Sequence, residues 1–269
     1  QCQPICYCTN FMQRSLPNAA AEIVNWLGYD AQAIGNHDVE TGHQVYDKWI
    51  SELKCPVLGA NIIDKATGLP YVKPYTIIER QGVKVAVIGM ITPAIPNWLT
   101  EKLWSGLYFE DMAKSAAKWV DIVKNKEHAD IVVGLFHSGW NGGISTLHYK
   151  EDETEHIARN IPGFDIIFFG HDHNPRHVTV KNNKGHYVLC LDPSCNAVYV
   201  ADAEIQLTID NGKVIDKEIN GRLTDVSRMT IDDEFTTAFA HITDSVKSFI
   251  NRRIGSITES IHTSDSFFG

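Results

Sequence analysis

Three short polar motifs, each placed directly after a strongly apolar run, constrain this chain more than any other feature of its sequence. They are Gly35-Asn36-His37-Asp38, His137-Ser138-Gly139 and Gly170-His171-Asp172-His173. The runs before them, such as residues 131–136, are short and apolar enough to be strands buried in a sheet. Functional loops of α/β sheets follow the carboxyl ends of strands, so we expect the three motifs at one sheet edge.

The rest of the chain alternates helical and strand-like periodicity before it changes to strands alone. Helices are predicted over 18–27, 45–53, 111–124 and 151–160, and strands over 30–34, 56–63, 131–136 and 165–169. A hairpin is predicted to join 75–79 to 83–91, and a second one joins 198–209 to 213–219 through Asp210-Asn211-Gly212. A last helix is predicted over 231–250. This order predicts an α/β fold, a two-sheet sandwich flanked by helices.

The residues that follow the apolar runs are suited to binding metal ions. Imidazole nitrogen together with amide or carboxylate oxygen is a donor set for Zn, Mn or Fe. Two such ions roughly 3.5–4 Å apart can clamp a phosphoryl group and activate a water. Each motif alone has an ordinary alternative, namely a turn, a core histidine or a solvated His-x-His loop. Their occurrence together, each after a buried-type strand, favours a metal site.

Together these motifs resemble the calcineurin-like metallophosphoesterases, specifically the branch of 5'-nucleotidases and 2',3'-cyclic-nucleotide 2'-phosphodiesterases, which includes UDP-sugar hydrolase-like proteins. The resemblance implies a metal-dependent hydrolase of nucleotide phosphoesters. It also implies that Asn36, His137 and His171 bind one divalent ion and that His173 binds the other. It further implies a catalytic pair, in which His37 stabilises the leaving-group or phosphoryl oxygens and Glu40 orients and charges His37.

The sequence departs from the pattern of this branch at its start. Members begin with Asp-x-His followed by a Gly-Asp whose carboxylate bridges both metals, and this chain contains neither pattern. We therefore expect residues 1–250 to be a catalytic domain lacking its first strand–loop segment, and 251–269 to begin a linker to a separate C-terminal substrate-binding domain. Two divalent ions (Zn, Mn or Fe) are expected in the longer parent and one or none in this chain, which should then be a poor catalyst.

Composition limits the partners of the chain. The net charge is −9 and no Lys/Arg cluster is present, which argues against nucleic acid as a partner. The apolar runs are far shorter than the roughly 20 residues of a membrane span. The six scattered cysteines are predicted to be buried thiols, with Cys2, Cys6 and Cys8 as candidates for one disulfide. The resemblance implies a periplasmic, cell-surface or secreted protein.

Two alternatives stay open beside a nucleotide hydrolase. One is a catalytically inactive relative that binds metal or nucleotide, and the other is a hydrolase of sugar nucleotides or sulfur esters on the same fold. The remaining histidines are predicted to lie mostly at the surface, with His43 and His177 close to the motifs. The native metal, the preferred nucleobase and phosphate position, and the oligomeric state do not follow from the sequence.

Overall fold

A six-stranded sheet forms the centre of the protein in the computed structural model, which describes residues 15–256 and 258. In spatial order its strands are β11 (Arg176–Lys181), β12 (Tyr187–Asp192), β10 (Ile166–Gly170), β7 (Ile131–His137), β5 (Val83–Ile91) and β4 (Tyr75–Arg80). The four inner strands are mutually parallel, and the two outer strands run antiparallel to their neighbours. The carboxyl ends of β5, β7, β10 and β12 therefore meet at one edge.

Two helices cover one face of this sheet. They are α6 (Met112–Asn125) and α7 (Thr154–Asn160). Ile88, Val132 and Ile167 of the central strands pack against Met112 and Ile157 of these helices, and all five side chains are fully buried. Removal of so much apolar surface from water is the main force that fixes the strands in this layer.

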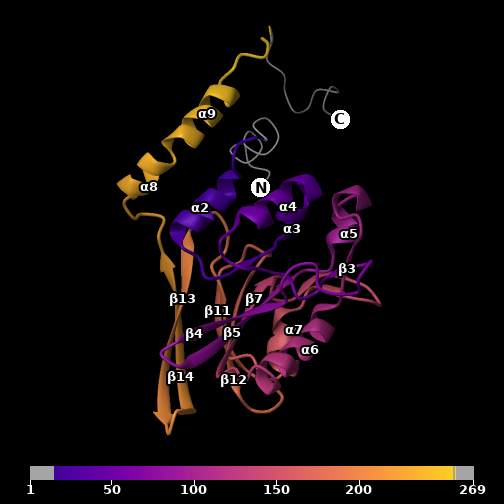
Figure 1. Cartoon of the computed structure of the whole chain (residues 1–269), viewed down its shortest axis with the longest axis vertical. Helices are drawn as coiled ribbons and strands as arrows, with labels where there is room; N and C mark the ends of the chain where they lie inside the picture. Colours follow the sequence, from indigo (N-terminus) through magenta and orange to yellow (C-terminus); the bar gives the residue numbers. More distant parts are fainter. Residues whose placement is uncertain (1–14, 257, 259–269) are drawn as a thin grey trace.

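A second β layer lies on the opposite face. It consists of the long hairpin β13 (Tyr199–Asp210) and β14 (Lys213–Asp225), together with the short parallel pair β1 (Gln32–Ala33) and β2 (Val57–Leu58). Alternate hairpin residues, among them Ile205 and Leu207, pack with Val133 and Leu191 of the central sheet. The helices α2 (Ala19–Leu27) and α4 (His43–Glu52) pack near β1 and β2. Figure 1 shows these two helices side by side at one end of the sheets. The predicted two-sheet sandwich flanked by helices is confirmed.

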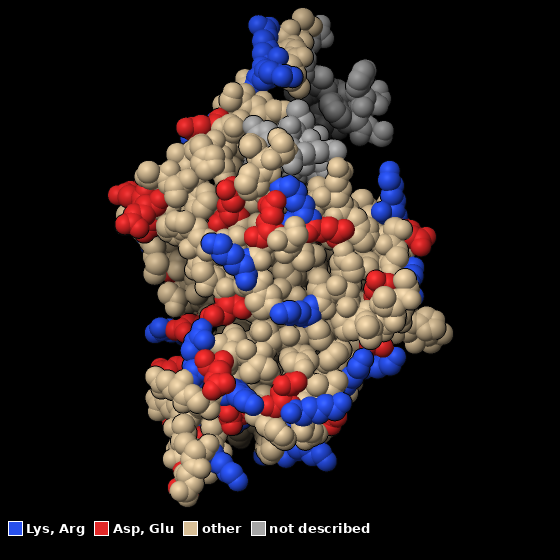
Figure 2. All heavy atoms as spheres, viewed as in Figure 1, with Lys and Arg blue, Asp and Glu red and all other residues tan. Residues whose placement is uncertain are grey.

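Shorter elements complete the described chain. They are α3 (Asn36–Val39), α5 (Ile95–Trp98), the 3-10 helix η2 (Glu101–Leu103), the pair β3 (Ile62–Asp64) and β6 (Leu107–Phe109), the hairpin β8 (Gly142–Ser145) and β9 (Lys150–Asp152), and the helices α8 (Asp233–Ala238) and α9 (Ala240–Ile250). Within residues 15–256, every helix is too short or too polar to cross a membrane. Figure 2 shows acidic and basic side chains interspersed over the face in view.

The predicted first helix is confirmed together with both of its ends. The Asn18 side chain accepts the backbone N–H groups of Ala20 and Ala21, which lack carbonyl partners in the first turn. Gly28 ends the helix with a φ of 71°, a left-handed conformation that glycine adopts without steric cost.

Three other predicted elements are wrong in their extent. The strand over 56–63 is two strands, because the buried Asn61 side chain hydrogen-bonds both the N–H and the C=O of Ile91 in place of a strand pairing. The helix over 151–160 begins only at Thr154, since the residues before it form β9. The helix over 231–250 is interrupted at Phe239, which packs into a small apolar cluster with Phe235.

Candidate metal centre

The register of the central sheet places the second and third motifs side by side. His137 is the last residue of β7, and it lies opposite Ile91 of β5 and opposite Gly170 of β10. Because these strands are parallel and end together, the loop that follows Gly170 begins next to His137. The imidazole rings of His137 and His171 have centroids 5.1 Å apart.

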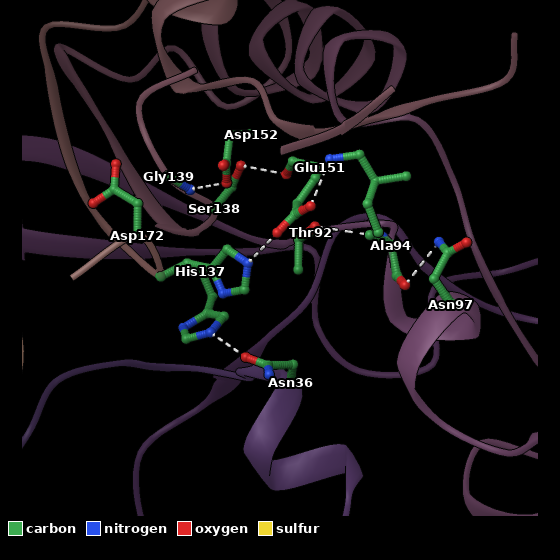
Figure 3. Close-up of polar contacts among 12 residues, drawn as sticks. Asn36, Thr92, Ala94, Asn97, His137, Ser138, Gly139, Glu151, Asp152 and Asp172 are labelled. Atoms are coloured by element: carbon green, nitrogen blue, oxygen red, sulfur yellow. Dashed lines mark hydrogen bonds and ion pairs between the residues drawn. The ribbon is translucent and has the colours of Figure 1, made fainter. Parts of the chain in front are cut away.

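The first motif approaches the same point from the second β layer. β1 leads into α3, whose first residue is Asn36, and its Oδ1 lies 2.6 Å from Nε2 of His137 (Figure 3). Gly35 permits this approach, since a Cβ there would lie 3.0 Å from ring atoms of His137. The Asp38 carboxylate accepts the Gly35 N–H at 2.9 Å and so fixes the start of α3. An amide oxygen and an imidazole nitrogen thus converge at the sheet edge.

The environment of His137 favours the neutral ring. Burial lowers the pKa of His137 to about 3, and the neighbouring His171, His37 and His173 contribute to that lowering. A neutral imidazole is the form that binds metal ions.

The loop that carries His171 and His173 is held in a strained conformation. Both residues have positive φ angles, 102° and 59°, which non-glycine residues rarely adopt. The Asp172 side chain between them accepts the N–H groups of Trp140 and Asn174, each at 2.9 Å. Such strain persists only where surrounding bonds impose it, and it concentrates at functional sites. His173 is exposed to solvent, whereas the side chain of His171 is mostly buried.

A buried carboxyl group lies next to this loop. Asp192, the last residue of β12, is fully buried and accepts the Ser194 N–H at 2.6 Å. Burial raises the pKa of Asp192 to about 7, and the nearby Asp172 adds to the rise. The Ser194 hydroxyl in turn donates to the backbone oxygen of His173 at 2.9 Å. The end of β12 therefore holds the loop in place through Ser194.

His37 and Glu40 form the pair that the resemblance implies. Nδ1 of His37 lies 2.8 Å from Oε2 of Glu40, the residue directly after α3. The His37 side chain is 62% exposed, so it is open to a substrate from solvent. Its Nε2 has no hydrogen-bond partner within the described part of the chain.

β9 and the residue that follows it hold the His137-Ser138-Gly139 motif in place. The Ser138 hydroxyl donates to the backbone oxygen of Glu151 at 2.9 Å and accepts the Glu153 N–H at 3.1 Å. The Gly139 N–H donates to Oδ1 of Asp152 at 2.6 Å (Figure 3). A Cβ at Gly139 would lie 2.7 Å from that oxygen, which is why glycine is needed there.

The buried Glu153 makes the stability of this region depend on pH. Burial, and next the nearby Asp111, raise the pKa of Glu153 to about 7 from 4.5. Between pH 4.5 and 7 the unfolded chain loses this proton while the folded chain keeps it, so folding stability falls as pH rises through that window and is level above it. We expect Glu153→Gln to remove this pH-dependent loss of folding stability, which is at most about 3 kcal/mol.

Urea unfolding of the metal-free protein checks this prediction. The variant should gain stability relative to wild type when the pH is raised from below 4.5 to above 7. Glu204→Gln, at an exposed position on β13, is the matched control and should show the same difference at both pH values. A difference for Glu153→Gln that does not change with pH would contradict the prediction.

Glu151 and Trp98 lie at the centre although the sequence did not single them out. Oε1 of Glu151 is 3.1 Å from Nε2 of His171, and the Trp98 ring lies 5.5 Å from the His171 ring. Ligand atoms of Glu151, Asp152 and His171 all lie within 4.8 Å of one another. Nothing in the sequence indicated these contacts, because Glu151 is predicted as the start of the helix over 151–160.

Other residues considered in the sequence have ordinary positions. His43 pairs with Asp47 within α4 and with the Ser105 backbone oxygen, and His177 is exposed on β11. Cys55, Cys190 and Cys195 are free thiols, and the first two are buried. The candidate disulfide residues Cys2, Cys6 and Cys8 lie outside the described residues.

Comparison with protein families agrees with this arrangement. The model of the calcineurin-like phosphoesterase family matches residues 11–175, more than half of the chain. The chain belongs to this family. The calcineurin-like phosphoesterase YfkN from Bacillus subtilis superposes over 94% of this chain and 82% of its own, with a TM-score of 0.80 and 22% identity. That likeness confirms the fold.

The relatives that are named as nucleotidases are longer proteins than this chain. The chain is 34% identical to a 5'-nucleotidase of Vibrio cholerae over 55% of this chain and 27% of the relative. It is 26% identical to a 2',3'-cyclic-nucleotide 2'-phosphodiesterase/3'-nucleotidase of Haemophilus influenzae over 91% of this chain and 41% of the relative. The expected resemblance to this branch is confirmed, and the chain spans less than half the length of these two relatives.

Proposed function

We propose that this chain is the catalytic domain of a divalent-metal-dependent phosphoesterase that acts on nucleotides, as a 5'-nucleotidase or as a 2',3'-cyclic-nucleotide phosphodiesterase. The observation that carries the proposal is the convergence of Asn36, His137 and His171 at one sheet edge in a calcineurin-like chain. The names of the nucleotidase relatives support the substrate class.

The donor atoms at this edge fit a divalent ion. Asn36, His137 and His171 supply an amide oxygen and imidazole nitrogens, the neutral form of His137 is favoured, and carboxylates lie beside His171. We assign these three residues to one ion and His173 to a second. When bound, such ions polarise a phosphoryl oxygen and increase the reactivity of water as a nucleophile at neutral pH.

His37 is the residue that we assign to the substrate itself. The Glu40 carboxylate holds the ring at Nδ1, so Nε2 is left to hydrogen-bond a phosphoryl or leaving-group oxygen. A donor fixed in place before the reaction stabilises charge that develops on oxygen without reorganisation during the step. Asn36 precedes His37 on the same helical turn, so the metal centre and this donor are positioned by one element, α3.

Metal content and phosphate release test the proposal together. The protein is dialysed against trace Zn and Mn, and bound metal per chain is measured by elemental mass spectrometry. Phosphate release is then followed with a 5'-nucleotide, a 3'-nucleotide and a 2',3'-cyclic nucleotide. We expect about one ion per chain, and slow phosphate release that a chelator removes and added metal restores.

Each outcome separates the proposal from an alternative. Bound metal without hydrolysis of any phosphoester would favour a binding protein without catalytic activity. Hydrolysis of sugar nucleotides or sulfur esters in preference to nucleotides would change the substrate class and keep the metal centre. Absence of bound metal would contradict the proposal itself. Location outside the cytoplasm stays a prediction from the resemblance.

A further inference from the structure

We propose that Glu151 is a positioning residue for His171, in which its carboxylate holds Nε2 of the ring so that Nδ1 is presented to the metal ion. This inference rests on the metal centre proposed above and adds a residue to it. It starts from one contact, the 3.1 Å separation between Oε1 of Glu151 and Nε2 of His171.

The contact is shielded from solvent. The side chains of His171 and Glu151 are only 13% and 15% exposed. A hydrogen bond between an imidazole and a carboxylate is stronger where water is largely excluded, and such a partner fixes both the ring orientation and the tautomer of a metal-binding histidine. The Trp98 ring, 5.5 Å from the His171 ring, further limits ring rotation.

The hairpin of β8 and β9 is built around the Glu151 carboxylate. Its second oxygen, Oε2, accepts the Ile144 N–H at 2.6 Å across the hairpin. Gly143 has a φ of 63°, and a Cβ there would lie only 2.5 Å from Oε2 of Glu151. The backbone therefore closes on the carboxylate from one side, and Oε1 is directed to His171 from the other. Glu151 is held in place independently of any metal.

The pairing decides which nitrogen of His171 can bind an ion. An ionised carboxylate only accepts hydrogen bonds, so Nε2 carries the ring proton and Nδ1 keeps its lone pair. Over residues 15–256, Nδ1 of His171 has no hydrogen-bond partner. The nitrogen left over is thus available to a metal, beside the His137 ring.

The tautomer of His171 gives a test that does not depend on metal binding. Long-range ¹H–¹⁵N correlation NMR of the metal-free chain should show the Nε2–H tautomer for His171, assigned by its loss in His171→Gln. In Glu151→Ala the ring should populate both tautomers. Glu155→Gln is the matched control, because Glu155 pairs with Arg159 on α7 at 2.9 Å and should leave the His171 signal unchanged.

Metal affinity gives the second readout. By equilibrium dialysis with Mn²⁺, Glu151→Ala should bind about 10–100-fold more weakly than wild type. Glu151→Gln keeps an oxygen that can accept a hydrogen bond from Nε2 but loses the charge. Its Mn²⁺ affinity should therefore lie between those of wild type and Glu151→Ala. Circular dichroism and thermal unfolding check that the variants fold.

The results separate this inference from the proposed function. An Nδ1–H tautomer in wild type, or unchanged Mn²⁺ affinity in a folded Glu151→Ala, would overturn the role of Glu151 and leave the metal centre standing. A wild-type chain with the Nε2–H tautomer that binds no Mn²⁺ would contradict the proposed function, while the pairing of Glu151 with His171 would stand.

Discussion

Replacing His137 with alanine should abolish metal binding and lower any metal-dependent phosphate release by about a thousandfold or more. His137 is the residue at which the centre converges, since its Nε2 faces Oδ1 of Asn36 at 2.6 Å and its ring lies against that of His171. Loss of an ion that supplies several kcal/mol to the transition state corresponds to at least that factor in rate. Elemental mass spectrometry and a phosphate-release assay on the same sample measure both effects.

His186→Ala is the matched control for this variant. His186 is exposed and directly precedes β12, at the end of the strand opposite to Asp192 and the candidate centre. It should bind as much metal as wild type and release phosphate at the same rate. A folded His137→Ala protein that retains wild-type metal content would exclude His137 as a ligand.

The proximity of the motifs could be predicted because strand ends are easy to recognise. Residues 131–136 form a continuous apolar run that ends in a histidine, and the parallel pairing then sets His137 opposite Gly170. Register between parallel strands brings together residues that are distant in the chain, so motifs at strand ends share one edge. The convergence of the second and third motifs follows from this rule, whereas the first motif reaches the centre from β1, which belongs to the other β layer.

The supporting residues could not be predicted in the same way. Glu151 lies in a short hairpin whose charged strand, Lys150–Asp152, has no apolar alternation, and the sequence predicts a helix from residue 151 onward. Its role depends on a tertiary contact with His171 and on Gly143, neither of which has a local signal. In the sequence Asp192 likewise resembles any polar residue at the end of a strand. Only its complete burial in the structure shows that it helps to hold the His171–His173 loop.

The short strands show a similar limit of sequence patterns. Residues 56–63 have the apolar content of one strand, but the Asn61 side chain bonds to the backbone of Ile91 and divides them. A buried polar side chain that replaces a strand pairing satisfies the backbone equally well, so apolar content cannot distinguish the two arrangements.

Replacing His37 with asparagine should reduce the rate and leave metal affinity unchanged, whereas His137→Ala should lose both. The His37 side chain is 62% exposed and is held by Glu40, so its loss removes no atom that we assign to an ion. Removal of one preorganised donor to a developing oxyanion costs about 10²–10³ in rate. We expect that loss in kcat, with Mn²⁺ binding unchanged in equilibrium dialysis.

Two further variants make the assignment of His37 specific. Glu40→Gln should lose less rate than His37→Asn, because glutamine still offers an oxygen to Nδ1 and only the charge that orients the ring is gone. His43→Gln changes a histidine on the adjacent helix α4 that pairs with Asp47 and should leave the rate unchanged. If His37→Asn instead lost metal together with activity, His37 would have to be a ligand. The division of the first motif into one ligand, Asn36, and one substrate donor, His37, would then be wrong.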